Sequence, residues 1–97
     1  MKARKSLISN EYKCYFCKET EKLELHHIYH GTANRRVSDM YGCVVYLCNE
    51  HHTGTDGVHG KNGHDRDMQL KIECQKRWEQ EYGSRQTFIK TFGRSYI

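Results

Sequence analysis

The sequence predicts a single small α+β domain: two short strands and a short helix, followed by a long helix and a final short helix. Three observations lead to this class. Residues 23–28 and 43–47 have the alternating or β-branched character of short strands. Residues 65–82 carry apolar side chains at every fourth position, which is typical of an amphipathic helix. No proline, internal repeat or linker divides the 97 residues.

The first part of this domain is expected to form a hairpin. Its strands are 23–28 and 43–47, and residues 29–42 are predicted to be a loop between them because they contain glycine, asparagine and serine. A short helix is expected at 49–53. Together these elements make up the core of the domain, about residues 12–60 of the single domain 1–97.

The second part is expected to be a helical extension over about residues 63–97. Gly83 is a favourable terminator of its long helix, and Ser84 can cap the short helix that follows. The apolar face of the long helix consists of Leu70, Cys74, Trp78 and Tyr82, and the short helix carries Phe88, Ile89 and Phe92.

Cysteine and histidine form two pairs with the same spacing. Two residues separate Cys14 from Cys17, and two separate Cys48 from His51. Such a spacer lets one tight turn present two ligands to a zinc ion, which prefers four sulfur or imidazole ligands. These four side chains are therefore the expected structural zinc site; the alternative is that they are ordinary buried cysteines.

The sequence leads us to expect neither export nor membrane insertion. No apolar stretch follows the basic residues at the N-terminus, and the longest apolar run, 43–48, is far too short to cross a bilayer. We expect a cytoplasmic protein with no membrane partner, in a compartment where cysteines stay reduced and available to metals. The two other cysteines, Cys43 and Cys74, are expected to be structural.

The net charge is +4, and the basic side chains are concentrated toward both ends of the chain. Such a periphery around a histidine-rich centre suits a polyanion bound over a cation site, or simply a soluble basic protein. Arg35 and Arg36 are candidates to hold a phosphate, with a solvated surface pair as the alternative, and Lys61 is a further candidate contact to nucleic acid. The glycines around Lys61 do not have the spacing of a nucleotide-binding P-loop.

Histidines on both sides of the expected hairpin form a second candidate site. His26 and His27 are neighbours on a strand, so their side chains point to opposite sides. One imidazole can then bind a metal while the other takes a proton from water at neutral pH. His52 can face the hairpin from the short helix. The candidates for a third ligand are His59, whose flanking glycines permit a close approach, and Asp56; the alternative for His59 is a solvent-exposed loop histidine.

These segments resemble the HNH (ββα-metal) endonuclease superfamily. Residues 24–27 are similar to the first signature segment of colicin-type nucleases, and residues 42–52 to the second strand and helix start of zinc-containing HNH domains. The resemblance implies a zinc-stabilised treble-clef or ββα-metal hairpin and helix. It also implies roles for four residues: His26 and His52 as ligands of a catalytic Mg²⁺, Mn²⁺, Ni²⁺ or Zn²⁺ ion, His27 as general base, and Glu24 as a residue that orients a ligand.

The activity that the resemblance implies is metal-dependent hydrolysis of DNA phosphodiester bonds by a small phage or prophage nuclease, in the cytoplasm of a bacterial or phage-infected cell. Cys43 stands where the family has its middle asparagine, and Asn34 is the candidate to serve instead. Two alternatives are a zinc-stabilised nucleic-acid-binding module without catalysis and a zinc domain that binds proteins. A phage or host protein partner is left open.

Overall fold

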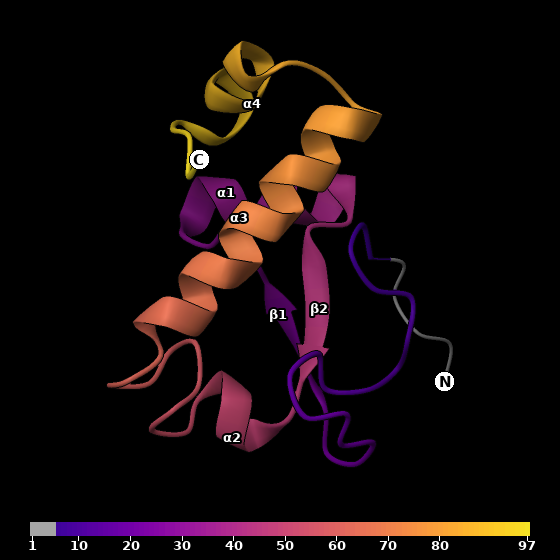
Figure 1. The fold of residues 1–97 in the computed structure, drawn as a ribbon, viewed down its shortest axis with the longest axis vertical. Coiled ribbons are helices and arrows are strands. Elements are labelled where there is room, and N and C mark those ends of the chain that lie inside the picture. Colours follow the sequence, from indigo (N-terminus) through magenta and orange to yellow (C-terminus); the bar gives the residue numbers. More distant parts are fainter. Residues whose placement is uncertain (1–5) are drawn as a thin grey trace.

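The fold is built on the predicted hairpin (Figure 1). The computed structural model describes residues 6–97, in which the elements follow one another as β1 (Glu24–His27), α1 (Thr32–Tyr41), β2 (Val44–Leu47), α2 (Asn49–His52), α3 (His64–Glu81) and α4 (Arg85–Phe92). The two strands pair antiparallel, with His26 opposite Val45 and His27 opposite Val44. The described residues therefore have the small α+β class that the sequence predicts.

The segment between the two strands is a helix, so the prediction of a loop over residues 29–42 is wrong. α1 is flanked by Gly31 (φ 98°) and Gly42 (φ 72°), which adopt the left-handed backbone that other residues disfavour. Ser38 is buried, and Val37 and Tyr41 pack against the core. Burial of this face stabilises the helix, although its glycine, asparagine and serine content favours a loop.

The remaining elements lie close to their predicted bounds. Ser84 caps α4 as expected, because its Oγ accepts a hydrogen bond from the N–H of Thr87 at 3.2 Å. Tyr82 was expected on the buried face of α3 but is 52% exposed, since the helix ends one residue before it. None of the helices described is long and apolar enough to cross a membrane.

The core lies between α3, α4, α1 and the hairpin. Trp78 on α3 contacts Phe88 on α4 and Tyr41 on α1, with ring centroids 5.4 Å and 5.7 Å apart. Cys43 and Cys74 are fully buried in this core, in agreement with their predicted structural role. Figure 1 shows α3 running diagonally across the hairpin, with α2 and the glycine-rich loop at one end of the molecule and α4 at the other.

Candidate functional site

Four potential metal ligands meet where the N-terminal turn lies against α2. The ligand atoms of Cys14, Cys17, Cys48 and His51 all lie within 4.8 Å of one another. Cys17 Sγ is 3.6 Å from Cys48 Sγ, and His51 Nδ1 is 3.2 Å from Cys48 Sγ and 3.7 Å from Cys14 Sγ. Tetrahedral zinc separates two sulfurs by about 3.8 Å and a sulfur from a nitrogen by about 3.6 Å. The cluster could therefore hold a metal ion and is compatible with structural zinc.

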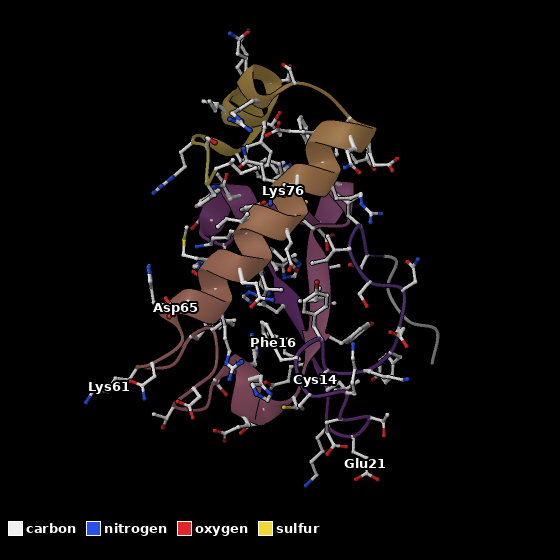
Figure 2. The ribbon with its side chains drawn as sticks, viewed as in Figure 1. Cys14, Phe16, Glu21, Lys61, Asp65 and Lys76 are labelled. Carbon is white, nitrogen blue, oxygen red and sulfur yellow. The ribbon has the colours of Figure 1, made fainter. Side chains whose placement is uncertain are left out.

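Backbone hydrogen bonds bring the N-terminal pair of ligands to this position. The N–H of Tyr15 donates to the C=O of Tyr46 at 3.0 Å, which fixes the turn beside β2. Lys18 closes the turn: with φ 68° it lies in the left-handed region, and its N–H donates to the C=O of Cys14 at 2.9 Å. Cys14 consequently lies next to α2, as Figure 2 shows.

The cysteines of this cluster differ in how readily they ionise. Burial opposes ionisation of Cys14, yet hydrogen bonds from the backbone of Cys48, Cys17 and Phe16 lower its pKa to about 6. Burial, and then the neighbouring Cys17 and Cys14, raise the pKa of Cys48 to about 11 against an opposing backbone bond from His51. The thiolate of Cys14 therefore forms readily, whereas ionisation of Cys48 beside it would be favoured by a bound cation.

Three imidazoles form a second cluster at the end of the hairpin near α2. The ligand nitrogens of His26 on β1, His52 on α2 and His59 in the following loop lie within 4.8 Å of one another. Their ring centroids are 5.2 Å (His26 and His52), 5.0 Å (His26 and His59) and 4.9 Å (His52 and His59) apart. Divalent metals accept such a set of three histidines and keep a position open for water or substrate.

Glu24 holds one of these rings in a defined orientation. Its Oε1 lies 2.8 Å from Nδ1 of His52, so that Nδ1–H donates to the carboxylate. The lone pair of Nε2 is then left for a cation. Histidines that bind metals usually have such a carboxylate on the other ring nitrogen, because it fixes the tautomer and raises the basicity of the ligand.

Nε2 of His26 is a buried polar atom without a hydrogen-bond partner among the described residues. The residue is only 2% exposed, and an unpaired group of this kind costs about 1–3 kcal/mol. Burial, and then the neighbouring histidines, lower the pKa of His26 to about 3. The ring is therefore neutral at physiological pH, which is the form that binds metals. An ion shared with His52 and His59 would satisfy the unpaired nitrogen.

The glycine-rich loop delivers His59 to the cluster. The N–H of His59 donates to the C=O of His52 at 2.9 Å, which ties the loop to α2. A Cβ on Gly60 would lie only 1.9 Å from the C=O oxygen of Gly54, so the close approach of successive turns requires glycine there. Burial, followed by the charges of His52 and His30, lowers the pKa of His59.

His27, the next residue on β1, has a different partner from His26. Its Nε2 lies 3.2 Å from Oδ1 of Asp39 on α1. His27 and Arg35 line an open cavity of about 540 Å³ together with the three-histidine cluster. They also line an adjoining cavity of about 340 Å³, which Arg36 and Asp39 border as well. A substrate in these cavities would contact His27 and Arg35 together.

Three other residues considered from the sequence lie apart from the clusters. Lys61 is exposed on the glycine-rich loop, points into solvent (Figure 2) and lines neither cavity. Asp56, the alternative third ligand, accepts a hydrogen bond from Asn62 at 3.3 Å. Asn34 donates to the C=O of Phe92 at 3.0 Å and so ties α1 to α4 instead of bracing the hairpin.

Sequence reasoning places His30 at the surface or near the substrate, and it misses Asp39. His30 lines the larger cavity, and its ring centroid is 5.3 Å from that of His59. Asp39 lies in the segment predicted as a loop. The apolar Val37 and Tyr41, four residues apart, are the signal that indicates a helix there and would have placed Asp39 on its last turn.

Comparisons with known proteins do not extend this description. No family model, curated protein or solved structure matches the chain significantly. The features that bear on function are therefore the two clusters, the residues that orient them, and the cavities beside His27.

Proposed function

We propose that this protein is a metal-dependent phosphodiesterase whose reaction centre comprises the three-histidine cluster and His27. Within that class we infer a DNA endonuclease of the HNH type. In this interpretation β1, β2 and α2 form the ββα-metal motif, and the four-ligand cluster is a structural zinc site of the treble-clef kind. The observation that carries the proposal is the buried Nε2 of His26, which has no hydrogen-bond partner within residues 6–97. His26 lies beside His52 and His59 and directly precedes His27 on the strand.

His26, His52 and His59 are the residues that would hold the catalytic ion, which is magnesium, manganese, nickel or zinc. When bound, such an ion supplies Lewis-acid stabilisation of the negative charge that develops on the phosphate. The neutral state of His26 supports this role. So does the bond from His52 to Glu24, because it occupies Nδ1 and leaves Nε2 as the ring nitrogen that could bind an ion.

His27 would act as the general base. Its imidazole takes a proton from a water molecule as the water oxygen bonds to phosphorus, and the bond from phosphorus to the 3′ oxygen breaks. The 3′ oxygen then takes a proton from solvent. The side chain of His27 is 15% exposed and lines both cavities, so water can reach a ring that is otherwise held in place.

Arg35 is the favoured contact to the reacting phosphate. It lines both cavities that His27 lines, whereas Arg36 lines only the smaller one. A guanidinium offers paired N–H donors that match two phosphate oxygens. Arg36 and Lys61 would contact the DNA backbone farther from the scissile bond. The net charge of +4 also favours a polyanionic substrate.

Cleavage of supercoiled plasmid by the purified, zinc-loaded protein tests the proposal. Loosely bound metal is first removed with EDTA, and Mg²⁺, Mn²⁺, Ni²⁺ or Zn²⁺ is then added. We expect nicking or linearisation with at least one ion. His27→Ala should be about 10²–10⁴-fold slower because the base is lost. His64→Ala is the matched control, since His64 is exposed at the start of α3 and belongs to neither cluster.

The possible outcomes separate the parts of the proposal. A rate for His27→Ala equal to that of His64→Ala would contradict the assignment of the base. No cleavage by the folded protein with any of the four ions would contradict the nuclease. Binding of plasmid fragments at low salt would then favour a nucleic-acid-binding module, and no binding would favour a protein-interaction domain.

A further inference from the structure

A carboxylate on α1 is bonded to the proposed general base. Oδ1 of Asp39 lies 3.2 Å from Nε2 of His27, at hydrogen-bond distance for a ring N–H donating to a carboxylate. The side chain of His27 is 15% exposed and that of Asp39 is 41% exposed. The bond is therefore shielded on the histidine side and open to solvent on the carboxylate side, at the rim of the smaller cavity.

The fold holds the two partners in place through their neighbours. Ser38, which precedes Asp39, is buried, and its Oγ donates to the C=O of Tyr29 at 2.7 Å and accepts from the N–H of Tyr29 at 3.1 Å. Tyr29 is two residues beyond His27. This reciprocal pair fastens the last turn of α1 to the chain that leaves β1. The end of α1 is also closed by the N–H of Cys43, which donates to the C=O of Ser38 at 2.8 Å.

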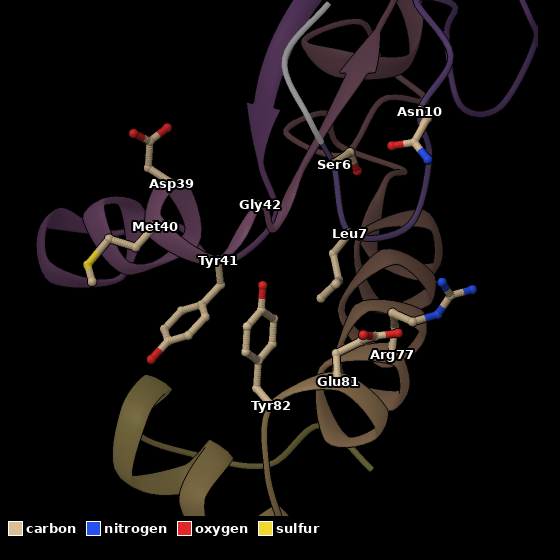
Figure 3. A pocket seen from close by; sticks show the side chains of 10 residues that line it. All are labelled: Ser6, Leu7, Asn10, Asp39, Met40, Tyr41, Gly42, Arg77, Glu81 and Tyr82. Carbon is tan, nitrogen blue, oxygen red and sulfur yellow. The ribbon is translucent and has the colours of Figure 1, made fainter.

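The orientation of Asp39 supports a role toward His27. Asp39 also borders a hollow on the other side of α1, together with Arg77, Glu81 and Tyr82. Figure 3 shows that its carboxylate points away from these three side chains. Arg35 and Arg36 share the smaller cavity with Asp39 and His27, so the bond lies on the side of α1 where the phosphate is expected.

We propose that Asp39 is the positioning residue for His27. This inference rests on the proposed nuclease function. The carboxylate accepts Nε2–H, which orients the ring and makes Nδ1 the atom that takes the proton from water. Asp39 touches neither the water nor the phosphate in this scheme, and it acts only through His27.

A double-mutant cycle on plasmid cleavage tests whether Asp39 acts only through His27. We expect Asp39→Ala to lower kcat about 10–100-fold, as loss of such partners does, with little change in KM. In the His27→Ala background the same substitution should cause no further loss. Glu81→Ala is the control, because it removes an exposed carboxylate from the hollow on the other side of α1, and it should leave the rate unchanged. If Asp39→Ala does not fold, Asp39→Asn takes its place in the cycle, because its shape is the same.

A second readout is independent of activity. In protein labelled with ¹⁵N-histidine, the Nε2–H proton of His27 should give a hydrogen-bonded resonance, identified by its absence from His27→Ala. That resonance should disappear in Asp39→Ala and persist in Glu81→Ala. The measurement uses the zinc-loaded full chain and needs no substrate.

The two readouts keep this inference distinct from the proposed function. If the full rate loss of Asp39→Ala recurs in the His27→Ala background, Asp39 has another role and the inference fails. If kcat is unchanged in Asp39→Ala, the inference fails as well. If the wild-type protein cleaves nothing, the nuclease fails, and the ring resonance alone decides whether Asp39 holds His27.

Discussion

Three histidines of this protein differ in the partners of their imidazole rings, and these partners suit the rings to different roles. Nε2 of His26 is buried and has no partner in the part of the chain that the structure describes, and that ring is held neutral. His52 donates to Glu24, and His27 is bonded to Asp39. A metal suits the first two rings, because their ligand nitrogens lie within 4.8 Å of each other and of a nitrogen of His59. The third ring lies outside that cluster and lines the adjoining cavity beside Arg35, where a substrate would meet it.

At the residue scale, we predict that Glu24→Ala weakens metal binding at the three-histidine cluster about 10–100-fold. The reason is that Nδ1 of His52 loses the 2.8 Å bond that fixes the tautomer and orientation of the ring. Calorimetric titration of Ni²⁺ into protein that retains its zinc measures the affinity. Glu21→Ala is the control, since Figure 2 shows this exposed side chain pointing into solvent. An affinity equal to that of the control would contradict the role of Glu24.

At the scale of elements, short segments place the side chains of the candidate site. α2 is only four residues long, yet it places His52 beside β1. The loop after it has no regular structure, but its hydrogen bonds to α2 and its glycines bring successive turns into contact. α1 fills the interval between the strands and carries Arg35 to the cavity. Each of these segments depends on neighbours for stability, because isolated short helices are marginal in water.

We predict that Gly60→Ala or Gly63→Ala disrupts the three-histidine cluster. Their Cβ atoms would lie 1.9 Å and 1.6 Å from C=O oxygens of the same loop, so the loop must open and displace His59. The melting temperature and the Ni²⁺ affinity should both fall. Gly83→Ala serves as the control, because its Cβ would meet no atom closer than 3.4 Å and should leave the Ni²⁺ affinity unchanged. Intact Ni²⁺ affinity in Gly60→Ala would show that the loop tolerates a side chain there.

At the scale of the whole molecule, the four-ligand cluster joins two segments that are far apart in the chain. Cys14 and Cys17 belong to the N-terminal turn, and Cys48 and His51 to the end of the hairpin. A domain of this size has a net stability of about 5–15 kcal/mol. Structural zinc sites contribute about 10–16 kcal/mol, so one ion in this cluster would decide whether the domain is folded.

We therefore predict that Cys17→Ala loses its tightly bound zinc and its cooperative thermal unfolding. Elemental analysis and circular dichroism melting measure the two effects. His59→Ala is the matched comparison, because it removes a ligand from the other cluster and should keep both the structural zinc and the melting transition. A Cys17→Ala protein that melts like the wild type would show that the four-ligand cluster does not stabilise the fold. Return of the transition on adding zinc to chelator-treated wild type provides the positive control.

The sequence by itself determined the parts of this protein that depend on local patterns. The strands, α3 and the cap of α4 follow from periodicity and from single capping residues. The two candidate ligand pairs can be recognised from their two-residue spacing, which a tight turn can satisfy. The different directions of the His26 and His27 side chains are expected from the alternation of a strand. These features need only a few consecutive residues, so they are visible without the fold.

Only the tertiary structure decided the features that depend on distant partners. Burial of Ser38 and its bonds to Tyr29 stabilise α1, against a local composition that favours a loop. The packing of the glycine-rich loop on α2 brought His59, and not Asp56, to the cluster. Asp39 meets His27 only because α1 returns to β1. The burial of a side chain and its hydrogen-bond partners depend on segments far apart in the chain, so they cannot be predicted from a few consecutive residues.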